Sequence, residues 1–172
     1  MTIWNLGIGL DYCSYEELKQ RKVIAQGWPD IDLTTLIPLK DEQIFVDVVE
    51  KLDEILYKPT QKELKSGRTM QNLLSIKEGD AVVCCEGIKA RGIAVILKTV
   101  KYFFYNNKTN IIYFEYANTI GPIEANQWID LTEEESKSIS VGAQGVPGIT
   151  KCHESREKVI EICKNHGFQV NE

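Results

Sequence analysis

Aromatic side chains are the residues of this 172-residue chain whose types and spacing are best suited to holding a ligand. Trp28 stands between Gly27 and Pro29, where an apolar run ends, so we expect its ring at the edge of a sheet. Residues 102–105 are all aromatic, and so are three of residues 113–116. Alternate side chains of a strand point to opposite faces of its sheet, so one set of rings would fill a core and the other could stack on a planar ligand such as a nucleobase. The alternative is that helices cover both faces and every ring packs in the core.

Positive charge is unevenly placed in a chain whose formal net charge is −5. Lys89 and Arg91 occupy a predicted turn flanked by glycines, where they could reach a phosphate backbone. A second basic group surrounds one acidic residue and consists of Lys58, Lys62, Lys65 and Arg68. The acidic total argues against a protein that holds nucleic acid by its overall field, so such a contact would need these groups as a local rim. A merely solvated surface is the alternative.

Residues that usually carry catalysis or bind metals are few and scattered. Both histidines, His153 and His166, lie in the last twenty residues, and no nucleophile elbow, zinc-binding helix or phosphate-binding loop is present. Together with Cys152 and Cys163 they could form a zinc site, but no C-x-x-C pair accompanies them, and free buried thiols are the simpler expectation. We therefore expect no catalytic machinery, no metal and no cofactor.

Length and composition favour one globular unit. Hydrophobic residues make up 43% of the chain and charged residues 26%, the balance of a folded soluble protein. No apolar run reaches the roughly 18 residues that span a bilayer, and the first residues lack the pattern of a signal peptide. We expect a cytoplasmic protein with one domain over residues 1–172, its core over about 2–131 and a C-terminal loop and helix over 132–172.

Hydrophobic periodicity and capping signals predict the order of the elements. Strands are expected at residues 2–10, 22–28, 81–85, 92–105, 111–116 and 120–131. Helices are expected at residues 14–21, 41–56, 60–74 with a break at Gly67, and 153–165, with a further helix start at 132–135. Loops or turns are expected at residues 30–38, 86–91, 106–110 and 141–148. Because Cys84 and Cys85 are adjacent in a strand, their thiols should face opposite sides of the sheet.

Successive hairpins after a helical segment tend to curl the sheet. We therefore expect an α+β fold with a curled, barrel-like mixed sheet flanked by helices.

Five segments in a fixed order carry a family resemblance. They are WNLGIG at 4–9, VIAQGWPDIDL at 23–33, IKEGDAVV at 76–83, GIKARGIAV at 87–95 and YANTIGPIEANQW at 116–128. In this order they resemble the EVE-type, PUA-like domains, which are related to the YTH fold. The chain is most similar to the versions at the N-terminus of McrB-like and related modification-dependent restriction proteins. The resemblance covers about residues 2–131.

The resemblance implies a reader of a modified, methylated DNA base, which is flipped out of the duplex into an aromatic pocket. It implies that Trp28 is the main ring of that pocket, matching the tryptophan of the family's IGW element, and that Trp4 and Asn5 join it from the first strand. The other pocket residues that it implies are Asp30, Asp32, Asn118 and Tyr116. The basic residues named above would hold the nucleic-acid backbone.

Two other functions fit the same pocket. One is a binder of RNA or modified RNA, since PUA-like and YTH-like domains also serve RNA, and the other is a sensor of a small molecule or nucleotide. For the first function the partners would be double-stranded DNA with a modified base and an NTPase or nuclease domain or subunit, with no membrane. The sequence leaves open which modification is read.

Overall fold

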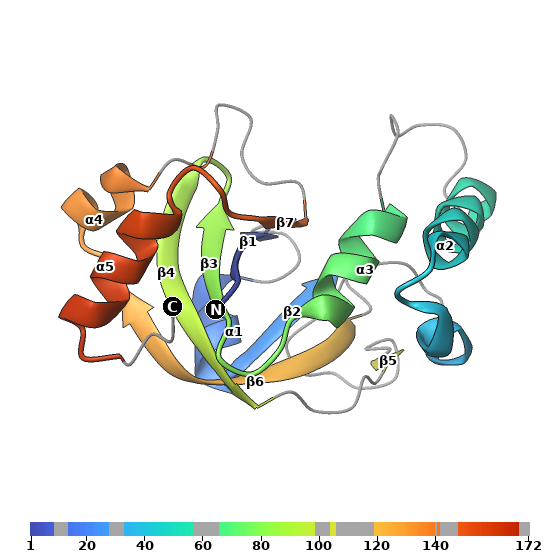
Figure 1. Cartoon of the computed structure of the whole chain (residues 1–172), viewed down its shortest axis with the longest axis horizontal. Coiled ribbons are helices and arrows are strands. Elements are labelled where there is room, and N and C mark those ends of the chain that lie inside the picture. Colours follow the sequence, from blue (N-terminus) through green and yellow to red (C-terminus); the bar gives the residue numbers. More distant parts are fainter. Residues whose placement is uncertain are drawn as a thin grey trace.

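The computed structural model describes residues 1–8, 14–27, 33–56, 66–98, 104–105, 119–139, 141 and 148–168. Within these ranges the chain forms an α+β fold with seven strands in one mixed sheet and six helices (Figure 1). The strands are β1 (Ile3–Ile8), β2 (Val23–Gly27), β3 (Ala81–Glu86), β4 (Lys89–Lys98), β5 (Phe104–Tyr105), β6 (Thr119–Asp130) and β7 (Ile149–Lys151). The helices are α1 (Tyr15–Arg21), the 3-10 helix η1 (Thr34–Leu39), α2 (Gln43–Leu56), α3 (Ser66–Ser75), α4 (Glu133–Ser138) and α5 (Arg156–Asn165).

The sheet is open in the described part of the chain. Its order is β2-β6-β4-β3-β1-β7, with β5 also paired to β6. The α+β class and the mixed sheet are thus confirmed, whereas the expected barrel-like curl is wrong, because β2 and β7 stand at opposite ends of this order. The reason lies at the β1 end of the sheet: β1 pairs parallel to β3, and β7 pairs with the other side of β1. The sheet therefore grows outward at that edge instead of returning onto its hairpins.

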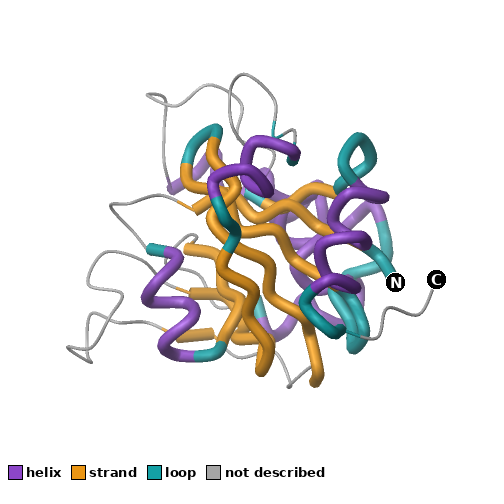
Figure 2. Tube along the Cα trace, turned by 90° about the vertical axis from the view of Figure 1, so that its left-hand side faces the viewer, coloured by secondary structure: helices purple, strands orange, loops and turns teal. Residues whose placement is uncertain are grey.

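Helices cover both faces of the sheet (Figure 2). On one face α1, α2 and α3 bury a core around Leu18, Phe45 and Leu73. On the other face α4 and α5 bury a second core around Val83 and Val159. Because successive strand residues alternate between faces, Cys84 belongs to the first core and Cys85 to the second, as predicted.

Most elements begin and end close to their predicted positions. The capping box of α1 is present, with the Ser14 side chain accepting from the Glu17 N–H and the Glu17 carboxylate accepting from the Ser14 N–H. A second capping box, of Thr132 and Glu135, opens α4. The predicted strand at 111–116 and the capping box at 60–63 lie outside the described residues.

Two local predictions are wrong, and one short strand was not predicted. Part of the expected loop 30–38 is helical, since η1 covers Thr34–Leu39. Gly67 does not break a helix but lies in the first turn of α3, where a Cβ atom would stand 2.3 Å from the Val46 carbonyl oxygen. It lets α3 and α2 approach closely. Strand β7 was not foreseen, because three residues give too short a pattern to read from sequence.

None of the described helices has the length and apolar character that crossing a membrane requires.

Candidate functional site

The β2–β6 pair forms the corner of the sheet at which the two main segments of the expected pocket join it. Gly27, the last residue of β2, is the register partner of Thr119, the first residue of β6. On the other side of β6, Thr119 also pairs with Tyr105 of β5. The described part of β2 therefore ends, and that of β6 begins, at paired positions. The pocket candidates Trp28, Asp30, Asp32, Tyr116 and Asn118 themselves lie outside the described residues.

Trp4 is a core residue in this structure. Its side chain is buried with 2% exposure, and its indole N–H donates a 3.0 Å hydrogen bond to Asp80 Oδ2. The Asp80 carboxylate, also buried, accepts two more hydrogen bonds, from the backbone N–H groups of Thr2 at 2.8 Å and Lys77 at 3.2 Å. Asp80, the aspartate of the IKEGDAVV segment, thus ties β1 to the turn before β3. The Trp4 ring is packed in the core.

Asn5 points to the other face of the sheet. Its strand neighbours Trp4 and Leu6 belong to the core under α1–α3, whereas Asn5 alternates with them and pairs with Thr150 of β7. Its Oδ1 atom is buried and has no hydrogen-bond partner among the described residues. Trp4 and Asn5, expected to contribute to one pocket, therefore line opposite faces.

The predicted basic turn is wrong in detail, because Lys89 and Arg91 belong to strand β4. The turn consists of two residues, Gly87 and Ile88, and Glu86 pairs directly with Lys89 across it. Gly87 has a φ of +60°, which suits the first position of a tight hairpin turn and costs a glycine little. Lys89 is exposed, while Arg91 Nε lies 3.0 Å from Glu86 Oε2 in an ion pair.

The second basic group is represented in the described residues by Arg68 alone. Arg68 lies on α3 and contacts Gln71 and, at 3.4 Å, Gln43. Figure 1 shows α3 and the β3–β4 hairpin in separate parts of the molecule. Among the described residues, the two basic groups do not form a continuous rim. The other three members, Lys58, Lys62 and Lys65, fall outside the described ranges.

Tyr15 is the centre of a polar and aromatic cluster that the sequence did not reveal. Its hydroxyl donates to Asp130 Oδ1 at 2.8 Å and lies 3.3 Å from the Ile129 carbonyl oxygen. Its ring packs edge-on against Trp128, with the ring centroids 5.7 Å apart. The ring also lies against Gly92, where a Cβ atom would stand 2.0 Å from the hydroxyl oxygen. Gly92, the second glycine of the GIKARGIAV segment, is therefore needed to make room for this ring.

The charges around Tyr15 keep it a hydrogen-bond donor. Burial, and then the hydrogen bond and negative charge of Asp130, raise the pKa of the Tyr15 hydroxyl well above its usual range. Lys19 bridges both Asp130 oxygens, at 2.7 and 2.5 Å. The hydrogen bond from Lys19 lowers the pKa of Asp130, with the Tyr15 hydroxyl adding to it. The neutral Tyr15 hydroxyl lies between a carboxylate and a carbonyl, where it acts as a clamp between α1 and β6 and not as a base.

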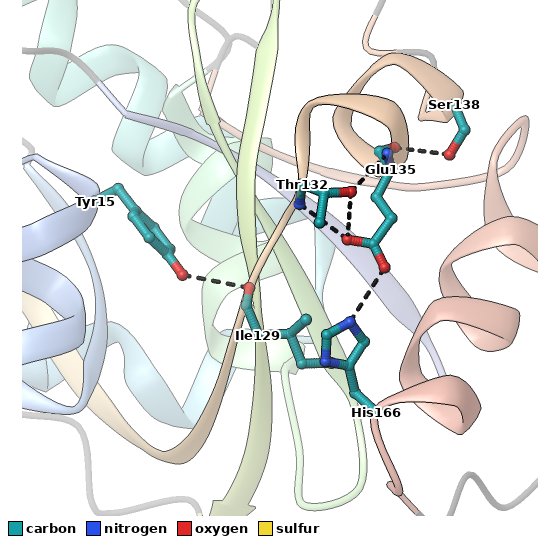
Figure 3. A network of polar contacts seen from close by, with 6 residues as sticks. All are labelled: Tyr15, Ile129, Thr132, Glu135, Ser138 and His166. Carbon is teal, nitrogen blue, oxygen red and sulfur yellow. Dashed lines mark hydrogen bonds and ion pairs between the residues drawn. The ribbon is translucent and has the colours of Figure 1, made fainter.

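A second polar network joins α4 to the end of α5 (Figure 3). Glu135 accepts from the Thr132 backbone N–H and hydroxyl, both at 2.9 Å, and its other oxygen lies 3.1 Å from His166 Nε2. The Thr132 backbone hydrogen bond is the main reason that the pKa of Glu135 is lowered, and His166 adds to it. His166 is thereby held in the position that ends α5.

The thiols of the second core are poor nucleophiles. Burial raises the pKa of Cys85 to about 12 and that of Cys163 to about 11, so both stay protonated at neutral pH. Cys84, Cys85, Cys152 and Cys163 are buried thiols that are not part of a disulfide, as expected. Within the described ranges no group of three or more His, Cys, Asp or Glu side chains could hold a metal ion.

No protein-family model matches the chain, and no curated protein does.

Proposed function

We propose that this chain is a nucleic-acid-binding module that recognises a modified base in DNA, and that the base stacks on Trp28. Any catalytic activity would then belong to another domain or to a partner protein. A methylated base is the first candidate. The proposal rests on the ordered motifs given above and on the corner of the sheet from which the candidate segments extend.

The observation that carries the proposal is the pairing of Gly27 with Thr119. A flipped base needs a ring to stack on and polar groups at its edge, brought together from different parts of the chain. The residue after Gly27 is Trp28, and the residue before Thr119 is Asn118. Because Gly27 and Thr119 are in register, the two chain positions next to them, which carry an aromatic ring and an amide 90 positions apart in sequence, are joined to one corner of the sheet.

Three buried ionisable groups of the described residues are not activated as a base or a nucleophile. Tyr15, Cys85 and Cys163 all have a raised pKa, so each is neutral at physiological pH. A catalytic base or nucleophile would need a pKa near the working pH. These groups instead stabilise the two cores and the clamp between α1 and β6.

The test is a titration of fluorescent duplexes that differ in one base. Matched short duplexes would carry 5-methylcytosine, N6-methyladenine or no modification, with RNAs of the same sequence alongside, at two salt concentrations. We expect one modified duplex to bind more tightly than its unmodified counterpart. Trp28→Ala should reduce this preference by about 5- to 150-fold, since stacking on one aromatic ring is worth about 1–3 kcal/mol per base. Ile88→Ala, at an exposed residue of the β3–β4 turn, is the matched control.

The basic strand residue Lys89 separates backbone contact from base recognition. Lys89→Ala should weaken binding to all duplexes equally and reduce the slope of log K against log salt by about 1. Lys137→Ala, on α4 at the other face, should leave the slope unchanged. Equal affinity for all duplexes would refute modified-base recognition, tighter binding to the RNAs would favour an RNA partner, and binding to free nucleotides alone would favour a sensor.

A further inference from the structure

Helix α2 lies at the outer edge of the molecule, with α3 between it and the sheet (Figure 1). Phe45, Val46, Val49 and Asp53 form its buried side. Ile44 and Ile55 are instead 51% and 60% exposed, and they are two of the three large hydrophobic side chains that stand exposed among the described residues. The molecule therefore leaves apolar surface open along one helix.

These exposed residues form a continuous stripe along α2. Ile44, Val48 and Ile55 follow one another at helical spacings of four and seven residues, and Leu52 continues the row toward the buried side. Val48 and Leu52 are both half-buried. We call Ile44, Val48, Leu52 and Ile55 the α2 stripe.

Two opposite charges lie beside the α2 stripe, one helical turn apart. Asp47 and Lys51 are both exposed and occupy the same side of it. Within the chain, Asp47 accepts a hydrogen bond from Gln43 at 2.8 Å, and Lys51 pairs with Glu54. Such exposed contacts between neighbours on a helix are weak, so they can be exchanged for others.

The two ends of the α2 stripe, Ile44 and Ile55, lie at equal distances from the middle of the helix. A two-fold axis that passes between residues 49 and 50 and relates two antiparallel copies of α2 places Ile44 opposite the partner's Ile55. The same axis brings Asp47 to the height of the partner's Lys51, within about one residue of helix rise, and on the same side of the stripe. Apolar residues thus meet apolar residues, and each acidic side chain meets a basic one.

We propose that the α2 stripe is a dimerisation surface whose occupant is a second copy of this chain, packed antiparallel through α2. The match of charge and spacing across the two-fold axis favours a second copy over an unrelated partner. One helix face is smaller than the roughly 800 Å² per partner of a standard interface, so the dimer is weak. We expect a dissociation constant between about 10 µM and 1 mM. This inference does not depend on the proposed nucleic-acid binding.

Sedimentation equilibrium over a range of protein concentrations tests the proposal. We expect the apparent mass to rise from monomer toward dimer, and Ile44→Ser with Ile55→Ser to weaken association at least tenfold. Both residues are more than half exposed, so the fold should tolerate these changes. Ile88→Ser is the matched control, because Ile88 is 66% exposed but lies on the β3–β4 turn away from α2, and it should leave association unchanged.

A charge exchange tests the antiparallel register directly. Asp47→Lys makes one variant basic at both positions, and Lys51→Asp makes another acidic at both. Each variant alone should stay monomeric, whereas an equimolar mixture should associate, since both cross-pairs are then restored. This pattern cannot arise from contacts within one helix, because there Asp47 bonds to Gln43 and Lys51 pairs with Glu54, and mixing the two variants restores neither contact.

A monomeric mass at all concentrations would overturn the proposal, as would equal effects of Ile88→Ser and the double variant. A mixture of the two charge variants that fails to associate would also overturn it.

Discussion

The Tyr15 hydroxyl donates a 2.8 Å hydrogen bond to Asp130 across 115 residues of chain. Tyr15 begins α1 and Asp130 ends β6, so this bond fixes the first helix to the end of the longest strand. Lys19, one turn further along α1, neutralises the same carboxylate. The position of α1 on the sheet thus depends on a polar contact as well as on the apolar packing of Leu18.

We expect Tyr15→Phe to destabilise the fold by about 1 kcal/mol, because it removes one hydrogen bond and leaves the ring in place. Asp130→Asn should cost a similar amount. In a double-mutant cycle the two costs should not add, since both variants lose the same contact. Urea unfolding followed by circular dichroism gives the free energies, and additive costs would mean that the two groups do not interact.

Stability should fall in acid because the pKa values of Asp130 and Glu135 are lowered in the folded state. A carboxyl group with a lower pKa in the folded than in the unfolded chain stabilises the fold above its unfolded pKa, near 4. This contribution disappears as the pH falls through the folded pKa. Urea midpoints at pH 7 and pH 3 should therefore differ more for the parent protein than for Asp130→Asn or Glu135→Gln.

His166→Ala provides the control for Glu135. Since the Thr132 backbone hydrogen bond is the first cause of the lowered pKa and His166 only adds to it, removing the imidazole should keep most of the acid sensitivity. If His166→Ala removed as much as Glu135→Gln, the contact with His166 would be the dominant one instead.

Local signals in the sequence predicted those parts of the fold that depend on neighbouring residues. The capping boxes at Ser14 and Thr132 are satisfied within one helical turn, so four residues suffice to recognise each. The opposite orientation of Cys84 and Cys85 follows from strand geometry alone. The curl of the sheet could not be read in this way, because it depends on where β1 and β7 pair, and their partners are distant in the chain.

The candidate site residues also divide into those set by neighbouring residues and those set by distant partners. Trp4 was a candidate for the pocket because a tryptophan in a first strand can face either a ligand or the core, and only the distant Asp80 decides between them. Lys89 and Arg91 were placed in a turn because two glycines flank them, but the chain turns at Gly87 and continues as a strand through Gly92. Tyr15 escaped notice because its partners, Trp128 and Asp130, lie more than 110 residues away.

Asp80→Asn should be strongly destabilising, by about 2–4 kcal/mol. The buried carboxylate accepts hydrogen bonds from three N–H groups, and an amide would turn one acceptor into a donor facing them. Chemical unfolding followed by tryptophan fluorescence would report it. Asp41→Asn is the matched control, since Asp41 is exposed and pairs with the neighbouring Lys40, and it should change the free energy of unfolding by less than about 0.5 kcal/mol. Equal costs at the two sites would contradict the role of Asp80.

Gly67→Ala tests the close approach of α2 and α3. Alanine is the better helix former by about 1 kcal/mol, so an exposed position would gain stability. At Gly67, however, the added Cβ atom would stand 2.3 Å from the Val46 carbonyl oxygen, which belongs to the backbone and cannot rotate away. The helices must then separate, and we expect a net loss of about 2 kcal/mol in urea unfolding. Arg68→Ala, at the next and exposed residue of α3, should change stability by no more than about 0.5 kcal/mol. A Gly67→Ala protein as stable as the parent would mean that the two helices are not in close contact at this point.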